Sequence, residues 1–180
     1  TLQAMLQKLD LNMYDFEKVD RFIEYGLEVC KTKSSDEAFR ILTGIIEKTE
    51  EQYFNEYISV LNYLQSAKVL DWIEQQSEKV KNASSSWGQL AASSKFDWKR
   101  AEKWINSGRP LSLIALDALK LCTTTNERLN QSPWTRELNP SLNDMPRSEK
   151  IAELIIKYQS EDNVPRVKNA VNTIIKNLYE

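Results

Sequence analysis

The chain has 180 residues, of which 24 are Lys or Arg and 26 are Asp or Glu, so its net charge at pH 7 is -2. Its length is enough to bury a sizeable core, and the 41% share of hydrophobic residues, with only four glycines and five prolines, is typical of a folded domain. We therefore expect one domain over residues 1–180, and we exclude a chain-wide positive field of the kind that gathers nucleic acid.

Apolar residues recur at helical spacing along the N-terminal half of the chain. This spacing predicts helices over about 15–31, 34–48, 51–64 and 67–80, and the second of them begins with a capping box formed by Ser34 and Glu37. The third and fourth could be one helix with a bend at Gln65 and Ser66. A short turn of helix is expected over 87–92, after three consecutive serines.

The stretch from 96 to 122 predicts two helices and the corner between them. Asp97 can accept hydrogen bonds at the start of the first helix, and Gly108 can end that helix in a left-handed conformation. Pro110 can open the second helix, where no backbone N–H is needed. A helical hairpin is therefore expected here.

The second arm of this hairpin, about 111–122, is apolar on most sides, which is typical of a central helix. Its polar exceptions, Ser112, Asp117 and Lys120, fall together on a helical wheel, and we expect them on an exposed side. For Asp117 we favour a solvated edge or an ion pair with a Lys or Arg of a neighbouring helix over a catalytic role, because an unpartnered buried carboxylate is costly.

A long loop rich in Pro, Asn and Ser is expected at about 123–147. Ser148 is then predicted to cap a helix, and Pro165 to open the last one. No segment alternates with the period of two that a strand requires, so we expect no sheet and an all-α fold of antiparallel helical hairpins.

Two segments of the chain are alike when they are aligned on their corners, Pro110-Leu-Ser-Leu-Ile-Ala-Leu-Asp-Ala-Leu and Asp162-Asn-Val-Pro-Arg-Val-Lys-Asn-Ala-Val-Asn-Thr-Ile-Ile. Each follows a shorter helix, and Ala115 and Ala170 occupy similar inner positions. This pattern, over residues 96–179, resembles the second helix of HEAT or armadillo-type repeats. The resemblance implies a short α-solenoid whose surface binds proteins or peptides. The separation of about 52 residues exceeds the 40–47 of such repeats, and an irregular helical bundle is the open alternative.

The chain contains no histidine, which removes the common nucleophile, proton-shuttle and metal-binding arrangements built on that residue. It also lacks the glycine-rich loops that cradle phosphates. We therefore expect a non-enzymatic protein with no cofactor and no metal site. No apolar run reaches the roughly 20 residues of a membrane span, so we expect a cytoplasmic protein without a membrane partner.

The main functional hypothesis is a protein-interaction module or scaffold. Trp134 stands in the Pro-rich loop near Arg136, and Trp and Arg are enriched at binding hot spots. The alternative for Trp134 is that it folds back onto the helices. With Arg109 and Lys103, these two residues form the predicted contact set for a protein or peptide partner.

A second hypothesis is nucleic-acid binding through a basic patch interleaved with Trp98 and Trp104 over residues 95–109, although Trp98 shares an apolar stripe with core positions. The cations of this patch are Lys95, Lys99, Arg100 and Lys103. A third hypothesis is a helical accessory domain of a larger enzyme.

Overall fold

The computed structural model describes residues 1–9, 16–80, 83–124 and 140–180, and within these ranges the chain is helical without a strand. A lone bridge between Asp97 and Asn143 is the one β-type pairing recorded in those ranges. The expected all-α fold is thus confirmed. The elements are α1 (Leu2–Gln7), α2 (Phe16–Thr32), α3 (Ser35–Glu47), η1 (Glu51–Tyr53), α4 (Phe54–Tyr57), η2 (Ile58–Leu64), α5 (Lys68–Gln76), α6 (Ser85–Ala92), α7 (Trp98–Asn106), α8 (Leu111–Thr123), α11 (Ser148–Glu161) and α12 (Pro165–Tyr179).

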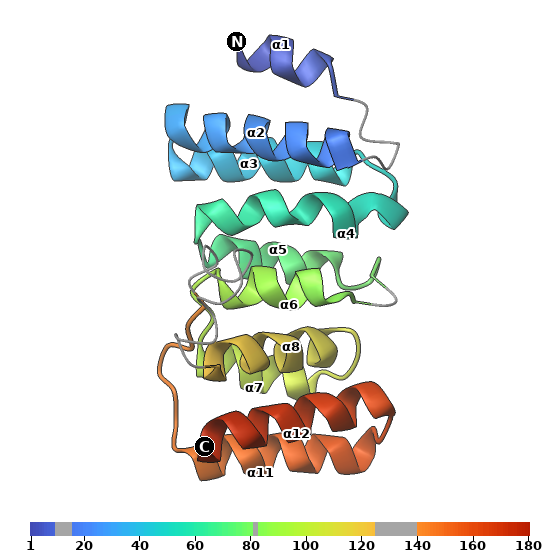
Figure 1. Ribbon diagram of the computed structural model, residues 1–180, viewed down its shortest axis with the longest axis vertical. Coiled ribbons are helices and arrows are strands. Elements are labelled where there is room, and N and C mark those ends of the chain that lie inside the picture. The colour runs from blue at the N-terminus through green and yellow to red at the C-terminus, as the bar shows by residue number, and fades with distance from the viewer. Residues whose placement is uncertain (10–15, 81–82, 125–139) are drawn as a thin grey trace.

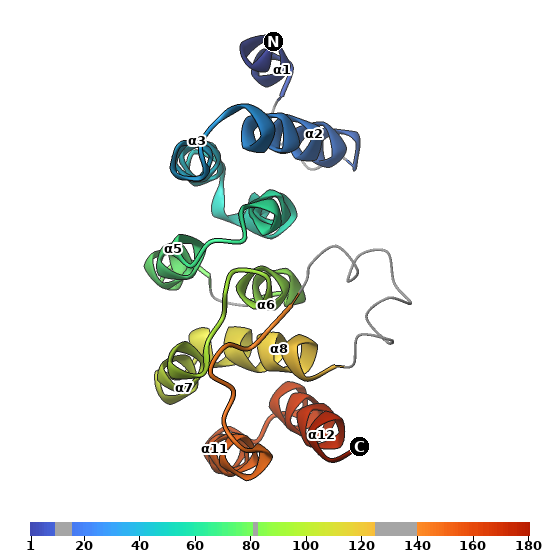
Figure 2. The ribbon, with the colours of Figure 1, turned by 90° about the vertical axis from the view of Figure 1, so that its left-hand side faces the viewer.

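The helices form an elongated stack in which successive elements alternate between two rows (Figures 1 and 2). One row holds α2, the segment from α4 to η2, α6, α8 and α12. Successive elements of this row pack directly on one another. The other row holds α3, α5, α7 and α11. Across the rows, α7 packs on α8 and α11 on α12.

The first helices follow from local signals. The Ser34 hydroxyl accepts a hydrogen bond from the Glu37 amide at 3.2 Å, as the capping box predicts, and α3 starts directly after it. The sequence patterns did not predict α1, which Thr1 caps by accepting from the amide of Ala4. The apolar residues of α1 pack against the core beside α2.

The α-helix expected over 51–64 was wrong in type, because most of that segment is 3-10 helix. Only Phe54–Tyr57 is α-helical, and η2 continues to Leu64. Ile58, Leu61 and Leu64 are spaced by three, which matches the three residues per turn of a 3-10 helix. Gln65 then takes a left-handed conformation with φ 48°, so α5 is a separate helix and the prediction of one continuous bent helix was wrong.

The corner between α7 and α8 has the predicted cap and left-handed glycine, and Pro110 stands one residue before α8 instead of opening it. Asp97 accepts from the Arg100 amide at 2.8 Å, and Gly108 has φ 77°. At the C-terminal end, Pro165 is the first residue of α12, as expected. Ser148, in contrast, is the first residue of α11 rather than its cap, and Arg147 precedes it without a capping side-chain bond.

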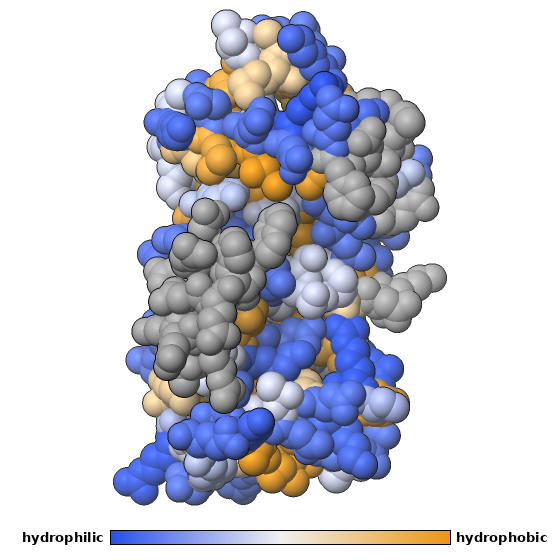
Figure 3. All heavy atoms as spheres, viewed as in Figure 1, coloured by the Kyte–Doolittle hydropathy of each residue, from blue (hydrophilic) through white to orange (hydrophobic). Residues whose placement is uncertain are grey.

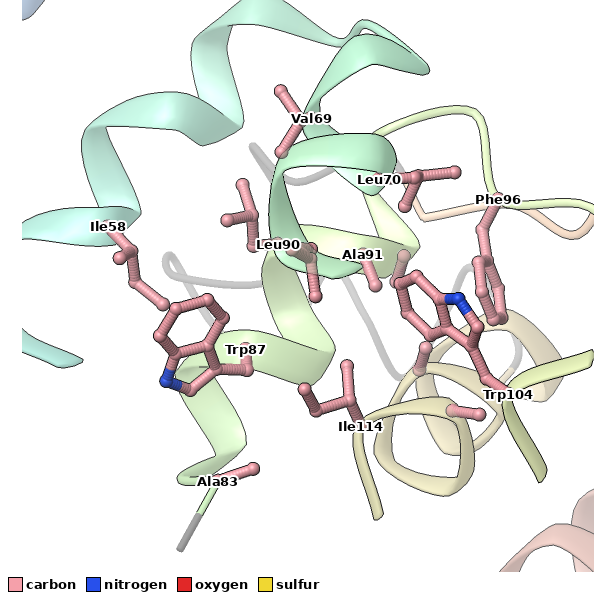
Figure 4. Close-up of a cluster of buried hydrophobic side chains, with 14 of the residues drawn as sticks. Ile58, Val69, Leu70, Ala83, Trp87, Leu90, Ala91, Phe96, Trp104 and Ile114 are labelled. Carbon is pink, nitrogen blue, oxygen red and sulfur yellow. The ribbon is translucent and has the colours of Figure 1, made fainter. Parts of the chain in front are cut away.

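A cluster of buried hydrophobic side chains, which includes two tryptophans, lies around α6 (Figure 4). Trp87 and Trp104 are fully buried, Trp87 stacks on Trp72 with ring centroids 5.9 Å apart, and Trp104 lies 5.5 Å from Phe96. Backbone contact between α6 and α8 is close at Gly88, where an added Cβ would lie 2.4 Å from the Cβ of Asp117. The centre of the stack is therefore tightly packed.

Residues 140–147, from the long loop expected at 123–147, run along the connection between α6 and α7. The amide of Ser141 donates to the carbonyl of Ala92, and Asn143 exchanges backbone bonds with Phe96 and Trp98. No helix of the described ranges is both long enough and apolar enough to cross a membrane.

Candidate functional site

The predicted contact residues divide into two groups. Lys103 lies on α7 and Arg109 at the corner between α7 and α8, and their side chains are 62% and 47% exposed. Trp134 and Arg136 lie outside the residues that the structure describes. Lys103 and Arg109 pair with different carboxylates, Glu74 and Asp162.

Glu74 on α5 binds the side of α7 that carries Lys103. Its Oε1 accepts from the indole Nε1 of Trp104 at 2.8 Å and from Arg100 at 2.9 Å, and Lys103 approaches to 3.3 Å. Burial alone would raise the pKa of Glu74, but the hydrogen bonds from Trp104, Arg100 and Lys103 outweigh it and hold the pKa below its ordinary value. Asp71, one turn earlier, accepts from the same Arg100. This group of charges joins α5 to α7.

Glu47 forms a similar connection between α3 and α5. Its Oε1 accepts from the indole Nε1 of Trp72 at 2.7 Å and more distantly from Gln76 at 3.4 Å. In both cases a glutamate of one helix accepts the indole proton of a tryptophan on the next helix of the same row. An indole N–H that is otherwise buried thereby gains its hydrogen-bond acceptor.

A third connection joins the corner after α7 to the corner after α11. Arg109 Nε donates to Asp162 Oδ2 at 2.7 Å, and a second guanidinium nitrogen donates to the other carboxylate oxygen. The Tyr158 hydroxyl also donates to Asp162, at 2.6 Å, and so accepts from Ser112, which is 2.7 Å away. The hydrogen bonds from Arg109 and then Tyr158 lower the pKa of Asp162. We call Glu47, Glu74 and Asp162, with their partners, the carboxylate clamps.

A pocket of about 120 Å³ adjoins the third clamp, between the end of α7 and α11. Ile105, Leu154 and Tyr158 supply apolar surface, Gly108 contributes backbone, and Lys157 and Glu161 stand at its edge with Asn106. The pocket is well below the 300–1,000 Å³ of typical small-molecule sites. It has room for one side chain of a partner.

The residues of the nucleic-acid hypothesis are only partly accessible. Lys95 and Lys99 are exposed, whereas Arg100 is neutralised by Asp71 and Glu74. Trp98 is 7% exposed and Trp104 is fully buried. Neither indole ring offers a free face on which a base could stack.

The expectation that the polar side of α8 is exposed was wrong. Ser112 is fully buried and Asp117 is only 7% exposed, because α8 is covered by α6, α7 and α12. Asp117 accepts from Arg166 of α12 at 2.9 Å, and Lys120 lies 3.4 Å away. The ion pair with a neighbouring helix was therefore the right alternative for Asp117, and the solvated edge was wrong.

The polar groups of the third clamp hold α8 and α11 together and are poorly arranged for nucleophilic chemistry. Ser112 faces a phenol, and burial together with the hydrogen bond to Asp162 raises the pKa of Tyr158, so that the phenol stays protonated at neutral pH and does not serve as a base. Burial also raises the pKa of the free thiol of Cys122, to about 12. Across the ranges that the structure describes, no three carboxylate or thiol side chains gather closely enough to share a metal ion.

The partners of the predicted cations are residues that the sequence patterns did not single out. Glu74 and Glu47 look like ordinary exposed acids of amphipathic helices, and Asp162 stood out only as the first residue of the second repeat-like segment. The sequence patterns gave no role to the hydroxyl of Tyr158. The available signal was the number of tryptophans on helix faces, since the N–H of a buried indole generally takes an acceptor. Trp72 and Trp104 follow this rule, whereas the Nε1 of Trp98 is buried without a partner.

Comparison with known proteins found no family model that matches the chain, no similar curated protein and no similar solved structure.

Proposed function

We propose that this chain is a non-enzymatic protein-interaction module that presents a preformed helical surface, built as a short HEAT- or armadillo-like α-solenoid. The observation that carries the proposal is the set of carboxylate clamps along one row. Glu47 links α3 to α5, Glu74 links α5 to α7, and Asp162 links the corner after α11 to the corner after α7. Each junction of that row is therefore held by a charge-assisted contact.

Such clamps favour binding because they fix the helices before a partner arrives. A surface whose helices are already held in place loses little conformational freedom on association, and that freedom is one of the main costs of binding. Hydrophilic residues cover most of the face seen in Figure 3, with hydrophobic residues emerging mainly in a band along α2. A long, mostly polar surface with a fixed shape suits recognition of a protein.

The stacking of the C-terminal helices supports the solenoid part of the proposal. α7 packs on α11 and α8 packs on α12, so the pair of α7 and α8 lies on the pair of α11 and α12 with like elements together. The two segments that resemble repeat helices correspond to α8 and α12. Ala115 and Ala170, at their matched inner positions, are both buried. In a solenoid each pair contacts its neighbours in this way.

The proposed contact residues are Lys103 and Arg109 on the clamped row, together with Trp134 and Arg136. Lys103→Ala tests the described part, and Trp134→Ala tests the residue with the strongest hot-spot chemistry. Lys168→Ala, an exposed lysine on α12, is the matched control. An affinity-tagged chain captures partners from its native source, and the purified partner is then titrated against each variant.

We expect Trp134→Ala and Lys103→Ala to weaken partner binding at least tenfold, with the thermal midpoint and helix content nearly unchanged. Lys168→Ala should change neither partner binding nor stability. Equal loss of folding and binding would contradict the proposal. The nucleic-acid alternative rests on Lys95, Lys99, Arg100 and Lys103, of which Arg100 and Lys103 are paired with carboxylates. It requires a gel shift that weakens steeply with salt. The accessory-domain alternative is tested by reading the parent reading frame.

A further inference from the structure

A pocket lies between the end of α7 and α11, beside the third clamp. Resting on the proposed interaction function, we propose that it receives one aliphatic side chain of a partner peptide, whose neighbouring acidic and basic residues pair with Lys157 and Glu161. The pocket volume of about 120 Å³ admits a single side chain and is too small for most cofactors or substrates.

Polar and apolar groups share the lining of the pocket about equally, and the apolar part comes from three side chains. Ile105 is 2% exposed and forms its base, and Leu154 and the buried ring of Tyr158 form the wall on α11. Gly108 closes the pocket with bare backbone, and a Cβ at that position would meet no atom within 4 Å. An aliphatic side chain placed here would leave water against Ile105, Leu154 and the ring of Tyr158, and the polar lining groups would face the flanking residues of the peptide.

The third clamp holds the pocket open in the absence of a partner. Tyr158, which lines the pocket, is fixed through its hydroxyl by both Ser112 and Asp162. Arg109 in turn ties Asp162 to the corner that carries Gly108. The two walls are thus positioned by the same hydrogen-bond network, and no rearrangement is needed for a side chain to enter.

The edge of the pocket carries one charge of each sign. Lys157 and Glu161 are exposed, stand one helical turn apart on α11, and make no ion pair within the described ranges of the chain. Opposite charges at this spacing, about 6 Å along the axis, select a peptide with the complementary order of charges. Such rim charges contribute more to specificity than to affinity. They distinguish this pocket from a purely apolar hollow.

The test uses a phage-displayed library of random 12-residue peptides selected on the whole purified chain, with affinities measured by fluorescence polarisation. The charge-exchanged variant Lys157→Glu/Glu161→Lys changes the edge of the pocket without touching its base. The control is the same kind of exchange on distant α2, Glu28→Lys/Lys31→Glu, where the pair is also exposed and lies at the other end of the stack (Figure 1).

We expect the selected peptides to share an aliphatic residue with an acid and a base within four positions. Their affinity should fall at least tenfold for the α11 exchange, recover when the peptide's own charges are exchanged, and stay unchanged for the α2 exchange. Peptides that bind all three proteins equally would overturn the pocket but not the interaction module, since they would dock on another helical surface. A library without binders would also overturn the pocket, and the proposed function would still be decided by capture of its partner.

Discussion

Substituting Gly88 with Ala tests the closest backbone approach in the stack. The new Cβ would lie 2.4 Å from Asp117 Cβ and 3.1 Å from the backbone nitrogen of Ala118. Ordinary carbon contacts are at about 3.5–4.0 Å, so α6 and α8 would have to separate by about 1 Å. Neither obstacle is a flexible side-chain end, and rotamer changes therefore cannot relieve the collision.

The expected net effect combines two opposing contributions. Overpacking of this kind costs up to about 3 kcal/mol, whereas Ala is favoured over Gly within a helix by about 1 kcal/mol. The free energy of unfolding should therefore fall by about 2 kcal/mol, which lowers the midpoint by about 4–8 °C for a chain of this size. Urea titration followed by circular dichroism measures the first quantity, and a thermal scan the second.

Gly44→Ala is the matched control, because Gly44 lies inside α3 and nothing stands within 4 Å of an added Cβ there. Only the helix-propensity gain applies, so this variant should be more stable by about 1 kcal/mol and melt about 2–4 °C higher. The same substitution thus changes stability in opposite directions at the two sites. If Gly88→Ala were as stabilising as Gly44→Ala, the contact between α6 and α8 would not be as close as described.

Three further predictions concern the clamps and the thiols. The pKa values of Glu74 and Asp162 are lowered from 4.5 and 3.8 in the folded state, so the two carboxylates stabilise the fold fully above those values and lose this effect as the pH falls below them. The urea midpoint of Glu74→Gln/Asp162→Asn should therefore drop less steeply in acid than that of the unchanged chain, and parallel curves would contradict this. Tyr158→Phe should cost about 1–2 kcal/mol by leaving the Ser112 hydroxyl short of a partner, and the Ser112→Ala/Tyr158→Phe double variant should lose less than the sum of the single changes in urea unfolding. Because the pKa of Cys122 is raised to about 12, iodoacetamide at pH 8.5 should label it much faster after unfolding than in the folded chain. Equal labelling rates in the two states, measured by mass spectrometry, would contradict the raised pKa.

The parts of the fold that sequence patterns predicted correctly are those decided within a few residues. The Ser34 cap and the left-handed Gly108 each depend on backbone geometry that one or two side chains determine locally. Helix periodicity located α2, α3, α7 and α8 within a few residues for the same reason. The 3-10 segment shows the limit of this reasoning, since its spacing of three resembles one edge of an α-helical stripe.

The carboxylate clamps could not be predicted from the sequence, because the residues that they join are far apart in the chain. Trp104 lies 30 positions from Glu74, and Asp162 lies 53 positions from Arg109. No local rule states which acid meets which donor until the order of helices in the stack is known. The sequence marked Lys103 and Arg109 as cations near aromatic residues, but whether a cation is free or paired is decided by the neighbouring helix.

For Asp117, the prediction of a central helix was correct, but the prediction that the polar side of that helix faces solvent was wrong. A helix that is apolar on nearly all sides is covered on nearly all sides, so its least apolar edge need not face water. The structure satisfies that edge internally, with Arg166 on Asp117 and Tyr158 on Ser112. Both partners come from the last two helices, which means that the polar residues of α8 select the way in which α11 and α12 dock. A buried acid in a central helix is then a device for positioning neighbours, and the surface available for a partner is the one that those neighbours, once positioned, leave exposed.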